Sequence, residues 1–193
     1  MPVRKTIPAK DGVYFITLTC AQWLPLFKIS DSYTAVYNWF NYLKENGHYI
    51  IGYVIMPDHL HTIIAFHNTG KTINSIVGNG KRFMAYEIVK NLKRQHQNNI
   101  LLQLQSMVNN TQQLINKQHE IFEPSFDWKE CRTVKFIEQK LQYIHWNPCK
   151  GEKKLVDLPE QYEYSSARFY LTGSHAAYSV ISYMELQDIN LTA

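Results

Sequence analysis

Two histidines separated by one residue, His59 and His61, are the first residues whose spacing could do chemistry. The segment HLHTIIAFH predicts a β-strand. Side chains alternate along a strand, so both imidazoles are expected on one face of a sheet and Leu60 on the other. Two neighbouring neutral imidazoles can chelate a divalent cation. Such a pair is a weak motif alone, and two ordinary histidines at a strand end are the alternative.

A second pattern is Tyr143 followed four residues later by Asn147, within YIHWN. Residues four apart are neighbours on a helix. The Asn147 side chain offers a carbonyl oxygen as a third metal ligand, and the Tyr143 phenol could attack phosphorus. With an ordinary pKa near 10, the phenol needs activation by a cation or a base. The alternative is that Tyr143 is a core or surface aromatic, one of 13 tyrosines. His145 lies on another face of the helix and is expected to be a surface or packing residue.

The two patterns are more informative together than apart. Two imidazoles and one amide leave coordination positions open for phosphate oxygens. A cation held there would polarise a phosphodiester while the tyrosine attacks it.

Alternating and helical apolar patterns predict the elements that position these residues. The order is β-α-β-β-α-β followed by one more helix, which is the split β-α-β, ferredoxin-like order. The predicted fold class is therefore α+β, with an antiparallel sheet, two helices on one face and the Tyr143 helix on the other. The predicted strands are 13–20, 48–56, 59–67 and one within 121–131, and the predicted helices start at Ser30 or Asp31, at Thr72 (to about 92) and at Thr133 (to 147 or beyond), with a short one around YSSARFYL.

The whole chain, 1–193, is predicted to be a single domain with an insertion at about 93–120. That segment is dense in Gln and Asn, yet its apolar residues keep helical spacing. It is interpreted as a helical arm, with a disordered polar linker as the alternative.

Composition sets limits on partners and location. A net charge of +4 and a pI of about 8.8 permit a polyanionic partner without demanding one. Three well-separated cysteines suggest reduced thiols in a cytoplasmic protein. The first residues lack an apolar signal region, and no apolar run reaches the roughly 18 residues of a membrane span.

Several segments resemble one known family. YVIMPDHLHTIIAF resembles the HUH-motif strand of the single-tyrosine transposases, and YIHWNPCKGEKKLV with PEQYEYSSARFYL resembles the REP-associated tyrosine transposase branch. YFITLTC and GKRFMAYEI also fit, so the resemblance covers most of residues 12–171. The insertion at 93–120 is longer than the family pattern, and FEPSFDWKE replaces its basic-aromatic segment.

The resemblance implies a metal-dependent single-stranded DNA endonuclease and strand transferase that forms a 5′-phosphotyrosine bond at hairpin-bearing repeat DNA. Tyr143 would be the nucleophile, and His59, His61 and Asn147 would bind Mg²⁺ or Mn²⁺. The partners would be single-stranded or hairpin DNA and no membrane, and the protein would be a monomer or a homodimer. Basic residues on the catalytic face would contact DNA, the candidates being Arg4, Lys5, Lys81, Arg82 and Lys150.

Two other functions stay open on the sequence. One is a ferredoxin-like module that binds nucleic acid without cutting it. The other is a phosphodiesterase in which a metal activates water and Tyr143 is incidental.

Overall fold

A four-stranded antiparallel sheet forms the centre of the protein. The computed structural model describes residues 7, 10–109, 117–151 and 154–186. The strand order is β2-β3-β1-β4, which is the ferredoxin-like order expected from the sequence. The strands are β1 (Gly12–Thr19), β2 (Tyr49–Ile55), β3 (His59–Phe66) and β4 (Asp127–Glu130).

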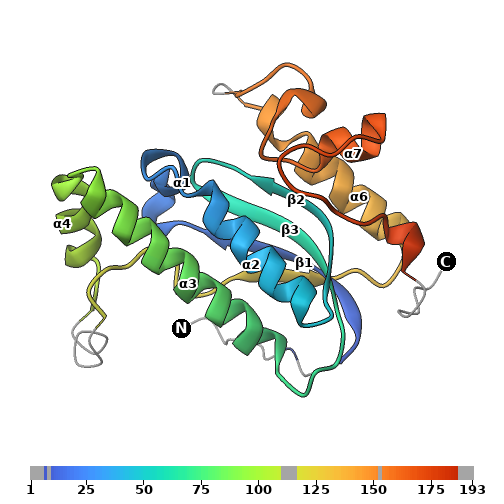
Figure 1. The fold of residues 1–193 in the computed structure, drawn as a ribbon, viewed down its shortest axis with the longest axis horizontal. Helices are drawn as coiled ribbons and strands as arrows, with labels where there is room; N and C mark the ends of the chain where they lie inside the picture. The colour runs from blue at the N-terminus through green and yellow to red at the C-terminus, as the bar shows by residue number, and fades with distance from the viewer. Residues whose placement is uncertain (1–6, 8–9, 110–116, 152–153, 187–193) are drawn as a thin grey trace.

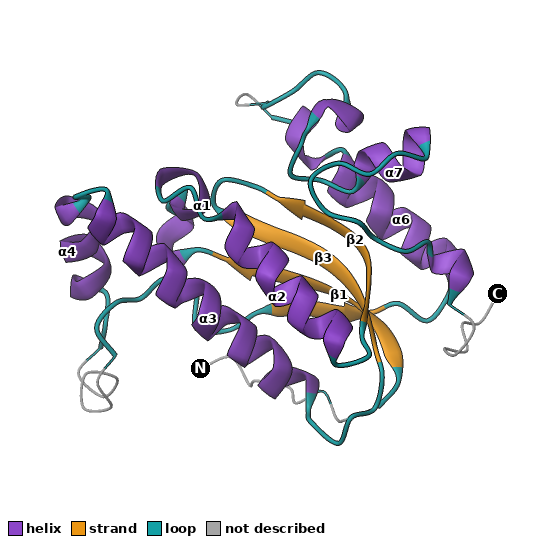
Figure 2. Cartoon of the chain, viewed as in Figure 1, coloured by secondary structure: helices purple, strands orange, loops and turns teal. Residues whose placement is uncertain are grey.

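Helices cover both faces of this sheet. Figure 1 shows α2 and α3 lying across one face, with α6 and α7 on the other. Figure 2 shows the same two helical layers with the strands between them. The helices are α1 (Leu26–Ile29), α2 (Tyr33–Glu45), α3 (Ile73–Arg94), α4 (Asn98–Ser106), α6 (Val134–His145) and α7 (Ala167–Thr172), with short 3-10 turns at Ala21–Trp23, Asn147–Cys149, Pro159–Gln161 and Tyr183–Glu185. The predicted α+β architecture is confirmed.

The alternation of side chains along the strands divides the core into two layers. Ile16 of β1 and Leu60 of β3 pack with α2 and α3 in one apolar cluster. Val13 of β1 and Ile63 of β3 pack with the buried side of α6 in the other. Leu60 therefore points away from the α6 layer, as predicted from its place between the two histidines.

Two glycines let helices approach their neighbours closely. A Cβ atom on Gly52 of β2 would lie 2.5 Å from Leu141 of α6, so this strand accepts the helix only without a side chain there. A Cβ on Gly80 of α3 would overlap the ring of Trp39 on α2. Gly52 thus sets how deeply the helix that carries Tyr143 sits on the sheet.

Three helix boundaries can be compared with their predictions. The Thr72 and Thr133 side chains accept hydrogen bonds from the backbone N–H groups of Ser75 and Phe136, so both predicted caps are confirmed. The prediction of Ser30 or Asp31 as a cap is wrong, because α2 begins after Ser32. The buried Ser30 hydroxyl instead donates to the Leu26 carbonyl at 2.6 Å, so it is committed to α1.

The Gln/Asn-rich segment is largely helical in its described part. The chain leaves α3, turns, and forms α4, whose Leu104 is fully buried against the main core. Residues 110–116 of this segment lie outside the described residues. The single-domain organisation with an insertion stays a prediction.

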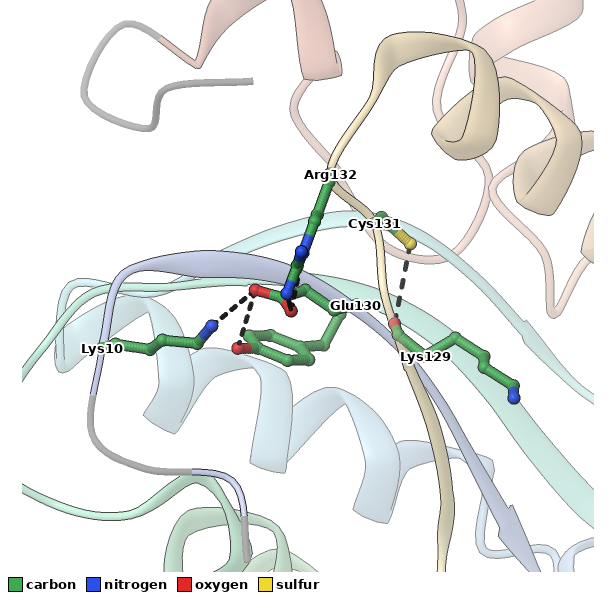
Figure 3. Close-up of polar contacts among 6 residues, drawn as sticks. Lys10, Lys129, Glu130, Cys131 and Arg132 are labelled. Atoms are coloured by element: carbon green, nitrogen blue, oxygen red, sulfur yellow. Dashed lines mark hydrogen bonds and ion pairs between the residues drawn. The ribbon is translucent and has the colours of Figure 1, made fainter. Parts of the chain in front are cut away.

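The edge strand β4 is fastened by a small ionic cluster. Glu130 accepts hydrogen bonds from the Lys10 ammonium at 2.6 Å and from Arg132 Nη2 at 2.8 Å. Figure 3 shows the Glu130 carboxylate between these two cations. The hydrogen bond from Lys10 lowers the pKa of Glu130, and Arg132 lowers it further.

Candidate active site

The two histidines lie side by side at the start of β3, on the face that α6 covers. His59 pairs with Thr19 and His61 with Thr17 across the β1–β3 ladder. The centres of the two imidazole rings are 4.6 Å apart, and both side chains are almost fully buried. The prediction that a one-residue spacing brings both rings to one side of the sheet is confirmed.

Each imidazole is held by a partner on its Nδ1 atom. The His59 Nδ1 atom lies 2.6 Å from Asp58 Oδ1, and the His61 Nδ1 atom lies 2.8 Å from Thr17 Oγ1. The hydrogen bonds that the described residues make to these rings both use Nδ1, which leaves the Nε2 atoms for another partner. Metal-binding histidines show this arrangement, in which a carboxylate or other oxygen fixes the ring through the nitrogen that faces away from the metal.

Burial keeps His61 neutral. Burial, together with the neighbouring His59 and Lys140, lowers the pKa of His61 to about 3. A neutral imidazole has a lone pair for a cation, whereas a protonated one has none. At neutral pH this ring is therefore in the form that binds metal.

Tyr143 approaches the histidines from α6. Ile137, Leu141 and Ile144 form the buried side of that amphipathic helix. The Tyr143 ring centre lies 5.3 Å from that of His61, while 44% of the residue stays exposed to solvent. The phenol is thus next to the histidine pair and still accessible to a large substrate.

Two lysines flank the Tyr143 ring. The Lys140 ammonium lies 5.6 Å from its centre, and the Lys150 ammonium lies 5.9 Å from it. Lys140 also lies over Phe15, at 4.7 Å from the ring centre. In the described part of the chain, no carboxylate lies within ion-pairing distance of either ammonium. Tyr143 therefore lies in a cationic environment suited to a phosphate group.

Asn147 does not belong to the α-helix that carries Tyr143. The helix ends at His145, Trp146 is its C-cap, and Asn147 opens a 3-10 turn. The prediction of a helix to 147 or beyond is therefore wrong by two residues. Asn147 lies one turn beyond Tyr143, and its place as a metal ligand stays a prediction.

The donor atoms present fit a divalent cation in part. Among the described residues, no three His, Cys, Asp or Glu side chains gather as a metal site. Two imidazoles with fixed Nδ1 atoms remain, so a third protein ligand would have to be a neutral oxygen such as that of Asn147. This sparse donor set would leave positions for oxygens of a substrate.

His145 takes no part in this site. It is buried, and its Nε2 atom lies 2.9 Å from the Ser166 hydroxyl, which in turn accepts from the backbone N–H of Tyr53 in β2. Burial lowers the pKa of His145 to about 4. His145 is thus a packing residue that fastens the end of α6 to the sheet.

The predicted DNA contacts are divided between the two faces. Lys150 lies beside Tyr143, but Lys81 and Arg82 lie on α3, which packs on the opposite face. Their expected position on the catalytic face is therefore wrong. The Lys81 ammonium donates to the Glu123 carbonyl at 2.5 Å, and Arg4 and Lys5 lie outside the described residues.

Sequence reasoning missed Thr17, Asp58 and Lys140. Lys140 precedes Tyr143 by three residues, so helical spacing alone places it on the same side of α6. Asp58 directly precedes the first histidine. Thr17 had no local signal, because its position opposite His61 depends on the register between β1 and β3.

Comparisons with known proteins inform the fold. No protein-family model matches the chain, and no curated protein matches it. Among solved structures, the chain is similar to a REP-associated tyrosine transposase bound to a REP hairpin. The two are 16% identical with a TM-score of 0.60, and the match covers 95% of each chain. At this identity the likeness shows a shared fold. In addition, no helix among the described residues has the length and apolar character needed to cross a bilayer.

Proposed function

We propose that this protein is a metal-dependent endonuclease and strand transferase for single-stranded DNA, with Tyr143 as nucleophile. One observation carries the proposal: the Tyr143 ring lies 5.3 Å from His61, which is itself 4.6 Å from His59. The resemblance of the motifs and the shared fold with a transposase bound to a hairpin support it.

Tyr143 is the nucleophile in the proposed reaction. The Tyr143 oxygen forms a bond to the scissile phosphorus, and the bond from phosphorus to the 3′-oxygen breaks. The phenolic proton leaves to solvent, and the departing 3′-oxygen takes up a proton to become a hydroxyl. The 5′-phosphate stays on Tyr143, so the bond energy is kept for rejoining a second strand.

The histidines and lysines prepare the phosphate for this attack. His59, His61 and Asn147 would hold Mg²⁺ or Mn²⁺, which when bound supplies a Lewis acid for the phosphate oxygens. Lys140 and Lys150 add positive charge beside the Tyr143 ring. Imidazole ligands suit Mn²⁺, and cellular abundance favours Mg²⁺.

Formation of a covalent adduct tests the proposal. The protein is incubated with an end-labelled single-stranded oligonucleotide that carries a hairpin, with Mn²⁺ or with EDTA, and run on a denaturing gel. We expect a band at the mass of protein plus DNA, which disappears with EDTA and in Tyr143→Phe. Tyr42→Phe, a variant of another exposed tyrosine, is the matched control and should keep the band.

The other functions give different results. Cleavage that persists in Tyr143→Phe without an adduct would identify a phosphodiesterase that uses water. Binding without cleavage by any variant would identify a module that only binds nucleic acid. Either result overturns the proposed function.

A further inference from the structure

A basic pocket lies between α3 and the segment that follows α4. Its volume is about 690 Å³, and we call it the α3 pocket. One wall is a stripe along α3, with Arg82, Tyr86, Val89 and Lys93, and the other is residues 117–124. In Figure 1 the chain after α4 passes alongside α3 on its way to β4. The second wall includes the end of the Gln/Asn-rich segment, residues 117–120, so part of the pocket is formed by the insertion.

The charges of the α3 pocket suit an anion. Its lining carries four cations, Lys81, Arg82, Lys93 and Lys117, against the carboxylates of Glu120 and Glu123. Both carboxylates are engaged: Glu120 pairs with Lys117, and Glu123 accepts from the Gln22 backbone N–H at 3.0 Å.

Arg82 and Lys93 are the cations free to meet a ligand. In the described part of the chain, neither of them pairs with a carboxylate. They lie eleven residues apart, at the two ends of the stripe. At 1.5 Å of rise per residue the separation along the helix is about 16.5 Å, which is the length of roughly five stacked nucleotides.

An aromatic ring lies between these two cations. Tyr86 is 63% exposed although it lines the pocket, and Val89 lies one turn further along the helix. A cationic groove with an exposed ring is the combination that binds single strands, because phosphates meet the charges and a base stacks on the ring. Paired bases in a duplex do not offer their faces in this way.

The α3 pocket also connects to the candidate active site around the end of the sheet. The Gln22 N–H bonds Glu123 at the pocket, and the next residue, Trp23, lies 5.6 Å from His59 between ring centres. Trp23 is 61% exposed. An exposed indole therefore lies beside His59 and is adjacent in sequence to the residue that bonds Glu123 at the pocket.

From these observations we infer that the α3 pocket binds a single-stranded flank of the DNA whose scissile phosphate lies at Tyr143. Arg82 and Lys93 contact its phosphates, and Tyr86 stacks on a base. The identity of the polyanion rests on the proposed function, but binding in the pocket requires neither metal nor the Tyr143 hydroxyl.

Binding of a fluorescein-labelled twelve-residue thymidine oligonucleotide tests the inference. Fluorescence anisotropy is measured with EDTA in a Tyr143→Phe background, so that no cleavage interferes. Replacing Arg82 and Lys93 together by Ala should raise the Kd at least tenfold. It should also reduce the slope of log K against log salt by about 1.4, because each phosphate contact to a single strand contributes about 0.7.

A matched double variant separates the pocket from net charge. Lys71→Ala with Lys90→Ala removes the same charge from exposed positions outside the pocket and should change the Kd less than twofold. Tyr86→Ala should weaken binding, whereas Tyr86→Phe should retain it. All these side chains are exposed, and circular dichroism verifies that each variant is folded.

Three results would overturn the inference: equal weakening by both double variants, equal binding of a matched duplex, or no effect of Tyr86→Ala. The adduct assay reads the proposed function separately. If an adduct forms and the pocket variants bind the oligonucleotide as tightly as the parent protein, only the inference about the pocket is rejected. If the pocket binds the oligonucleotide and no adduct forms, only the proposed catalytic function is rejected.

Discussion

Lys140 and Tyr143 lie one turn apart on α6, with the Lys140 ammonium 5.6 Å from the centre of the Tyr143 ring. The same ammonium lies over Phe15 and Phe136, so three rings hold it in place. A cation fixed beside a nucleophile stabilises negative charge that develops on the phosphate during attack. This relationship makes Lys140 as informative a target as Tyr143 itself.

Replacing Lys140 should slow the proposed reaction. We expect Lys140→Met to reduce the rate of adduct formation about tenfold or more, since donors to a developing oxyanion contribute on that order or above. Lys140→Arg should retain most of the rate because it keeps the charge. Lys135→Met removes an exposed lysine from the same helix and should have little effect. Equal rates for Lys140→Met and Lys135→Met would remove Lys140 from the mechanism.

Thr17 should affect metal affinity without touching the metal. Thr17→Val leaves His61 Nδ1 without its hydroxyl partner, so the ring loses its fixed orientation. Loss of such an outer partner typically weakens metal binding 10–100-fold. Titration of Mn²⁺ by calorimetry measures the Kd, and Thr34→Val on the exposed side of α2 is the control. An unchanged Kd for Thr17→Val would show that this hydroxyl does not support a metal site.

Gly52 should be required for the position of α6. In Gly52→Ala the new methyl group meets Leu141, and overpacking of this kind costs about 1–3 kcal/mol of unfolding free energy. Gly78→Ala is a useful contrast, because a Cβ at Gly78 has open space and alanine favours a helix by about 0.5–1 kcal/mol. Urea denaturation should thus give changes of opposite sign. Stability gained in both variants would contradict the close packing described for β2 and α6.

Glu130 should make stability depend on acidity. Its pKa is lowered in the folded protein by Lys10 and Arg132, so the stabilisation is complete above the unfolded value of about 4.3 and is lost as pH falls through the lower folded value. Glu130→Gln should therefore be less stable than the parent at pH 7, by up to about 1 kcal/mol for so exposed a cluster. The difference should shrink below pH 4. Denaturation at pH 7 and pH 3 measures it, and a difference that grows in acid would contradict the lowered pKa.

Local pattern was sufficient for most of the fold. The unbroken apolar run of β2 and the alternation around Leu60 predicted the right strands, and Thr72 and Thr133 predicted two helix starts. The same reliance on local sequence pattern explains the wrong prediction of Ser30 as a helix cap. A serine before an apolar run is typical of a helix cap, but the Ser30 hydroxyl donates a hydrogen bond to the Leu26 carbonyl of α1.

The candidate site was predictable where spacing within one element decides the geometry. His59 and His61 depend only on the two-residue period of a strand, and Lys140 on the helical repeat. Thr17 and Trp23 depend on pairing and folding across the chain, which no single segment encodes. The helix containing Tyr143 was predicted to reach Asn147, but the end of α6 is set by tertiary context. The predicted fold already placed the helix that carries Arg82 on the face opposite Tyr143, so its assignment to the catalytic face did not follow from the predicted topology.

The histidines and the tyrosine that approach one another here belong to the same polypeptide. If the proposed chemistry holds, every molecule carries a full set of reacting groups. The rate of nicking should then rise with the first power of protein concentration. Mixing a Tyr143→Phe chain with a His59→Ala, His61→Ala chain should restore no nicking activity, because neither chain carries both the tyrosine and the two histidines.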